Sequence, residues 1–103
     1  MLVNPIRVQS LRDEIGAEAF PDVLALFLEE SAQVVARLRA MDDPVAMAAD
    51  LHFLKGSALT MGLEDLADCC RRVEQGQSFD PAALADLFAR SRAALARLEV
   101  AMA

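Results

Sequence analysis

The chain contains a single histidine, His52, whose neighbours could support chemistry at an imidazole ring. Near neutral pH an imidazole has an unprotonated nitrogen that can act as a nucleophile. Lys55 follows three residues later, which is within side-chain reach on a helix. Because a phosphoryl group brings roughly two negative charges, an ammonium group at this spacing would offset that charge and help to orient the group.

Gly56, one turn after His52, is the second unusual feature. A glycine inside a helix costs roughly 1 kcal/mol relative to alanine. On an exposed face no packing demand justifies that cost, whereas bare backbone would let a second protein approach the imidazole closely. Each feature also has a plainer explanation: a surface histidine without a chemical role, a glycine in a helix–helix contact, and a lysine that is there by chance. Residue types and spacing indicate a docking surface with a titratable group, but leave these explanations open.

The direction of the His52 side chain depends on a helix that we expect from about Pro44 to Met61. Four apolar residues gather on its core face: Met47, Leu51, Leu54 and Ala58. His52 is more than a quarter of a turn from the centre of that group, so it should point towards solvent or the rim. Its own face is shared by Val45, Ala48, Lys55, Gly56 and Leu59.

Composition favours an all-α fold for residues 1–103 as a single domain, because good helix formers dominate and strand-favouring residues are sparse. Caps, prolines, glycines and apolar stripes predict five helices. Their expected ranges are Pro5 to near Gly16, Phe20–Met41, Pro44–Met61, Leu63–Gln75, and Pro81 onwards. Four long helices joined by short turns predict an up-down-up-down four-helix bundle, with the short N-terminal helix capping one end.

Charge and cysteine usage narrow the possible partners. The net charge of −6 argues against nucleic acid and against anionic membrane surfaces. We see neither a signal peptide nor an apolar run long enough to cross a membrane. Cys69 and Cys70 are adjacent, so a bridge between them is disfavoured and a reducing cytoplasm is the simplest setting. One histidine and two adjacent cysteines do not make a zinc site.

The segment His52-Phe53-Leu54-Lys55-Gly56-Ser57-Ala58, with Gly62 ten residues after the histidine, closely resembles the signature of histidine phosphotransfer (HPt) domains. The family pattern is His-x-Leu-Lys-Gly-Ser. The later run from Leu66 through Cys70 to Val73-Glu74 is similar to the fourth helix of the family. Two positions depart from the pattern: Leu63 stands where alanine is frequent, and Val73 where leucine is frequent.

The resemblance implies that His52 accepts a phosphoryl group from an aspartyl phosphate on a receiver domain and passes it to another receiver. Lys55 would steady the phosphoryl oxygens, Gly56 would give the receiver clearance, and Ser57 would support the helix turn. The partners would be response-regulator receiver domains and a hybrid histidine kinase. The domain itself would need no cofactor, since Mg²⁺ would sit in the partner receiver. An exposed working face favours a monomer.

Expected bundle geometry adds residues around the histidine. We expect Glu74, or else Gln77, to accept the proton of the non-reacting ring nitrogen, although a solvated glutamate at a helix end is the plainer alternative. Gln33 and Arg37 should lie beside the histidine. With Leu59 and Ala48 they could form a docking rim.

Three other interpretations compete with a phosphoryl carrier. A helical adaptor or dimerisation module would show no phosphorylation and would tolerate change at His52. A fragment of a hybrid kinase is a second alternative, although a chain that starts at Met1 and ends with the fifth helix favours a separate small protein. An enzyme acting alone is disfavoured, because no Gly-rich phosphate loop or acid/base pair appears. We therefore expect a carrier that depends on partner kinases and receivers.

Overall fold

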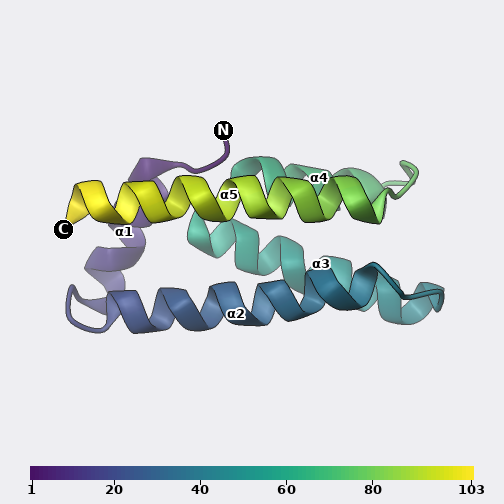
Figure 1. Cartoon of the computed structure of the whole chain (residues 1–103), viewed down its shortest axis with the longest axis horizontal. Helices are drawn as coiled ribbons and strands as arrows, with labels where there is room; N and C mark the ends of the chain where they lie inside the picture. Colours follow the sequence, from purple (N-terminus) through teal and green to yellow (C-terminus); the bar gives the residue numbers. More distant parts are fainter.

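The chain folds into five helices and no strand in the computed structural model, which describes residues 1–103. The helices are α1 (Pro5–Ile15), α2 (Phe20–Leu38), α3 (Pro44–Met61), α4 (Glu64–Glu74) and α5 (Pro81–Met102). The predicted all-α class is therefore confirmed. In Figure 1 the four helices α2 to α5 follow the long axis of the molecule, and the ribbon colours show that consecutive helices run in opposite directions. No helix combines the length and the apolar character needed to cross a membrane.

Three of the helices begin with the same local signal. Asn4, Asp43 and Asp80 have extended backbones, and each is followed by a proline. Each side-chain oxygen accepts hydrogen bonds from amides of the first turn, at 3.0 to 3.4 Å. Such a cap contributes about 1 kcal/mol, and the proline lacks only an N–H that the helix leaves unpaired anyway. These short polar signals fix where α1, α3 and α5 start.

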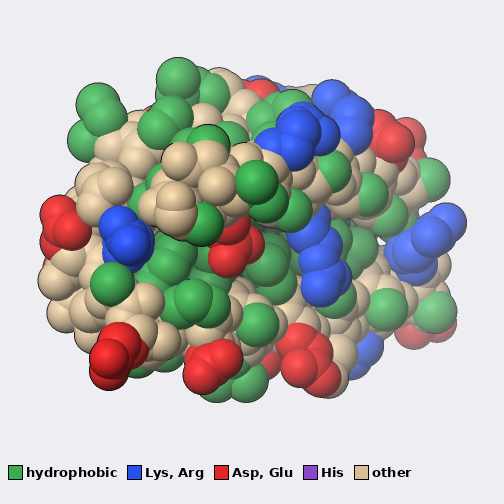
Figure 2. Space-filling view, turned by 60° about the vertical axis from the view of Figure 1, so that its left-hand side comes forward, with side chains coloured by type: hydrophobic (Ala, Val, Ile, Leu, Met, Phe, Trp, Pro, Cys, Tyr) green, Lys and Arg blue, Asp and Glu red, His purple; other side chains and the backbone are tan.

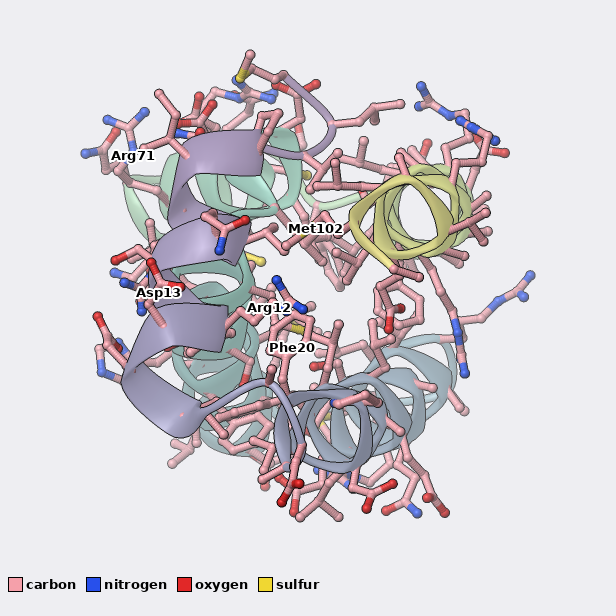
Figure 3. The ribbon with its side chains drawn as sticks, turned by 90° about the vertical axis from the view of Figure 1, so that its left-hand side faces the viewer. Arg12, Asp13, Phe20, Arg71 and Met102 are labelled. Atoms are coloured by element: carbon pink, nitrogen blue, oxygen red, sulfur yellow. The ribbon has the colours of Figure 1, made fainter.

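Gly62 ends α3 in the left-handed conformation, with φ 75° and ψ 20°. A Cβ at this position would lie 3.1 Å from both Arg7 Cβ and the Asn4 carbonyl oxygen, and the Asn4 amide donates to the Gly62 carbonyl at 2.8 Å. The glycine therefore reverses the chain into α4 and also lets α1 pack against the turn. Figure 3 looks onto this end of the molecule and shows α1 crossing it.

One hydrophobic core of 19 buried residues draws on all five helices. The apolar spacing of the sequence predicts Phe27 and Met41 in the core stripe of α2 and Leu87 in that of α5, and the structure differs in detail. α2 buries Leu28 and Val35, whereas Phe27 is only half-buried and Met41 lies beyond the helix, which ends at Leu38. α5 likewise buries Phe88 more fully than Leu87. A helix packed against two neighbours buries a broad stripe, so residues one position off the predicted row also reach the core.

The end that carries α1 is distinct from the face that carries the histidine. Figure 3 shows Arg12, Phe20 and Met102 gathered between α1, α2 and α5, where they line a hollow of about 200 Å³. In Figure 2, which brings this end forward, hydrophobic side chains gather between α5 above and α2 below, and no histidine is visible. His52 is thus reached from another side of the molecule.

Candidate functional site

His52 projects from α3 into solvent, with 75% of its side chain exposed. Its neighbours Leu51 and Leu54 face the core, at 3% and 0% exposure, so the helix turns the histidine away from the interior as expected. The ring makes one hydrogen-bond-range contact within the chain, between Nδ1 and Oε2 of Glu74 at 3.4 Å. The other ring nitrogen, Nε2, makes no hydrogen bond within the chain. It is therefore the ring atom that an approaching partner protein can reach.

Glu74 reaches the histidine from the last turn of α4. Because Gly62 reverses the chain, α4 returns antiparallel to α3 and brings its end level with His52. The second carboxylate oxygen, Oε1, accepts from Lys55 Nζ at 2.7 Å, and the side chains of Lys55 and Glu74 are each 25% exposed. The Lys55 ammonium, and less strongly His52, lower the pKa of the Glu74 carboxyl against the opposing effect of desolvation. Glu74 therefore stays ionised near neutral pH.

The structure distinguishes between the two residues predicted to hold the ring nitrogen. Glu74 contacts His52, whereas Gln77 makes no hydrogen bond to it. Gln77 lies in the loop after α4 and lines a hollow with Cys69 and Phe79, towards α5. The ammonium of Lys55 forms an ion pair with Glu74, a contact that was not predicted from the sequence.

Gly56 is exposed, and a Cβ built on it would meet nothing within 4 Å. The explanation that this glycine serves a helix–helix contact inside the chain is therefore excluded. Its backbone is regular helix, so no left-handed conformation requires glycine either. Ser57, in contrast, is 7% exposed and lies on the core side of α3, so it does not face a docking partner.

Apolar side chains surround His52 on the exposed side of α3. Of the predicted rim residues on this helix, Ala48 is exposed and Leu59 is 57% exposed. Val45 and Phe53 are also large exposed hydrophobics, at 79% and 42%. Phe53 was missed as a candidate, although its place directly after the histidine, off the apolar core face, could have revealed it. A helix face with this much exposed apolar surface is typical of a protein-binding site.

Gln33 and Arg37, the rim residues predicted on α2, lie across a groove from Phe53. The structure shows a hollow of about 340 Å³ there, which we call the α2–α3 hollow. Its lining residues are Glu30, Gln33, Val34, Arg37, Asp50 and Phe53. Neither Gln33 nor Arg37 makes a hydrogen bond or ion pair with His52.

Arg37 is not a free cation. Its Nε and Nη2 donate to the two oxygens of Asp50 at 3.2 and 3.0 Å, and this contact raises the pKa of the guanidinium. Asp50 was missed from the sequence, but the register of two antiparallel helices around the turn at Asp43 places it level with Arg37. The pair ties α2 to α3 beside the site.

A second hollow of about 340 Å³ flanks His52 on the side of α4. It is lined mostly by apolar residues: Pro44, Met47, Ala48, Leu51, Val73 and Glu74. The two hollows are lined by different residues of α3 near His52: Asp50 and Phe53 line the first, and Ala48 and Leu51 line the second.

Besides His52, the chain holds two thiols that could act as nucleophiles or as metal ligands. Cys69 and Cys70 are free thiols, and burial raises the pKa of Cys70 to about 12, so it stays a protonated thiol at neutral pH. No cluster of three or more His, Cys, Asp or Glu side chains is arranged to hold a metal ion.

Comparison with known families bears directly on this arrangement. The family model for the Hpt domain matches residues 22–101, which spans most of α2 to α5 and includes every residue described around His52. The chain belongs to the Hpt domain family. Neither a search of curated proteins nor one of solved structures gave a match. Hpt domains are phosphocarrier modules that work with response-regulator receivers and kinases, so membership implies phosphotransfer within a two-component phosphorelay. α1 lies outside the matched range of this Hpt domain.

Proposed function

We propose that His52 carries the phosphoryl group, accepting it from the aspartyl phosphate of one receiver domain and passing it to the aspartate of another. One observation carries this assignment above the others. The imidazole is 75% exposed, and the contact of Nδ1 with Glu74 leaves Nε2 as the nitrogen that faces outwards. An incoming phosphorus atom can approach that nitrogen without displacing any side chain of the domain.

The chemistry follows from the orientation of the ring. With its proton on Nδ1, the ring presents the Nε2 lone pair to phosphorus. The new N–P bond forms as the bond from phosphorus to the aspartyl oxygen breaks, and the aspartate leaves as a carboxylate. The proton on Nδ1 stays in place, so the phosphorylated ring carries a positive charge. The Glu74 carboxylate at 3.4 Å stabilises that charge and holds the ring in position.

In our proposal Lys55 acts both before and after the phosphoryl transfer. Before transfer its ammonium holds Glu74 at 2.7 Å and keeps that carboxylate ionised. After transfer the phosphoryl group, with roughly two negative charges, stands one helical turn away and competes for the same ammonium. Mg²⁺ would belong to the partner receiver, which supplies most of the charge neutralisation during the step.

The same proposal covers the organisation of the carrier. The alternating course of α2 to α5 in Figure 1 supports an up-down-up-down bundle with α1 as its capping helix. We propose that residues 1–103 act as a single domain and as a monomer in the cytoplasm, since the exposed face around His52 has to stay open to successive partners.

Phosphate exchange tests the proposal directly. Incubation with a radiolabelled, phosphorylated receiver domain should transfer label to the wild-type protein, and that label should be acid-labile and base-stable. His52→Gln should abolish the label while the helical signal and the melting temperature stay nearly unchanged. Label that survives on the variant would assign the phosphoryl group to another residue. No label on the wild type from any receiver of the organism would favour a helical adaptor instead.

A further inference from the structure

Two cations near His52 are each neutralised by a carboxylate, whereas one carboxylate that lines the α2–α3 hollow has no such partner. Lys55 is neutralised by Glu74 at 2.7 Å, and Arg37 by Asp50 at 3.0 Å. Glu30 lines the α2–α3 hollow and takes part in no ion pair. With two carboxylates and one guanidinium on its wall, the hollow has a net charge of −1.

Phe53 adds a second kind of attraction to the same hollow. Its side chain is exposed, at 42%, and it lines the hollow opposite the charged residues of α2. The face of an aromatic ring attracts a cation electrostatically, which contributes about 0.5–1 kcal/mol at an exposed site. A hollow that combines an unpaired carboxylate with an aromatic wall selects a positively charged side chain over an apolar or acidic one.

We propose that the α2–α3 hollow receives a lysine or arginine side chain of the receiver domain that docks over His52. The inference rests on the function proposed above and adds the chemistry of partner choice to it. Phe53 and His52 are both exposed on the same turn of α3, so a partner that covers the imidazole and this flank of the helix also covers the hollow. Arg37 repels the incoming cation less than an unpaired guanidinium would, because its Nε and Nη2 donate to the two oxygens of Asp50. Glu30 is then the residue that determines specificity.

Two neighbouring glutamates make a matched test possible. Glu29 and Glu30 are both exposed on α2, but only Glu30 lines the hollow. Glu30→Lys and Glu29→Lys change the net charge equally, so long-range attraction of a partner changes equally in both. The probe is the phosphorylated receiver domain that exchanges label fastest with the wild type in a panel from the organism. We expect kcat/KM for transfer to fall by about tenfold or more in Glu30→Lys, and by no more than about threefold in Glu29→Lys.

Two further experiments distinguish a loss of docking from a loss of chemistry at His52. Phosphoramidate donates a phosphoryl group to histidine with release of ammonia and needs no docking surface, so both variants should be labelled at the wild-type rate. In the receiver, a lysine or arginine changed to glutamate at the contacting position should restore transfer to Glu30→Lys. Equal losses in the two variants would overturn the proposal, and so would slow labelling of Glu30→Lys by phosphoramidate. Failure of the proposed function would look different, because the wild type itself would then take no label from any receiver.

Discussion

Lys55 Nζ lies 2.7 Å from Glu74 Oε1, so the cation next to the histidine is paired with the carboxylate that also contacts the ring. Glu74 therefore links two residues of α3 that are one turn apart. We predict that Glu74→Ala slows transfer from a phosphorylated receiver by about 10- to 100-fold, the worth of a hydrogen bond to a charged group. Glu74→Gln should lose less, because its amide oxygen can still accept from Nδ1. Single-turnover transfer rates measure both.

The control for this prediction is Gln75→Ala, which changes an exposed neighbour at the end of α4 that makes no side-chain hydrogen bond. It should transfer at the wild-type rate. A Glu74→Ala protein that transfers as fast as this control would show that the ring needs no partner at Nδ1.

The pKa of Glu74 gives a second prediction, with a definite sign. Lys55 is the largest cause that lowers it, so Lys55→Met should raise the pKa of the Glu74 carboxyl, while Lys55→Arg should largely preserve the shift. Titration of the carboxyl carbon by NMR measures this directly. The transfer rate of Lys55→Met relative to wild type should also decline as pH falls from neutral towards the ordinary pKa of a glutamate. An unchanged Glu74 pKa in Lys55→Met would show that the Lys55 ammonium does not stabilise the ionised carboxylate.

The same shift affects folding at acidic pH. A carboxyl with a depressed pKa in the folded protein adds stability above its ordinary pKa, and this stability is lost as pH falls through the folded-state value. Wild-type protein should therefore lose more stability than Lys55→Met between neutral pH and strongly acidic pH. Urea unfolding at the two pH values tests this difference.

Two buried hydroxyls in the core give a prediction about stability alone. Ser31 Oγ and Ser91 Oγ are fully buried and have no hydrogen-bond partner. A buried polar group without a partner costs about 1–3 kcal/mol, so Ser31→Ala and Ser91→Ala should each stabilise the fold by about 1 kcal/mol in urea unfolding. Ser10→Ala is the control, because that exposed hydroxyl has Glu14 as a partner at 3.4 Å. Destabilisation by either core substitution would reveal a hydrogen bond to water in the interior.

Much of the fold was predictable because its determinants are local. Asn4, Asp43 and Asp80 cap helices through hydrogen bonds to amides two or three residues away, and the prolines after them mark the same points. The direction of His52 also follows from a single helix and its core face. These interactions need no knowledge of how the helices pack.

The features that could not be predicted depend on which helices pack together and on which residues of each helix lie opposite one another. That Lys55 is engaged by Glu74, and Arg37 by Asp50, follows from the register between neighbouring helices, which single-helix periodicity does not contain. For the same reason Leu28 is buried more fully than the expected Phe27. Gln77 was a reasonable alternative to Glu74 by distance along the chain, but the loop after α4 directs it to the side of α5.

Gly56 leads to the last prediction, in which stability and function move in opposite directions. Since a Cβ there meets nothing within 4 Å, Gly56→Ala should stabilise the protein by about 0.5–1 kcal/mol through helix propensity alone. Gly56→Leu should fold equally well but place a bulky side chain next to His52, so transfer from a receiver should fall steeply while labelling by phosphoramidate persists. Ala36→Leu, on the exposed face of α2, is the control for added bulk. Unimpaired transfer by Gly56→Leu would show that the bare backbone beside the histidine is not needed for the approach of a partner.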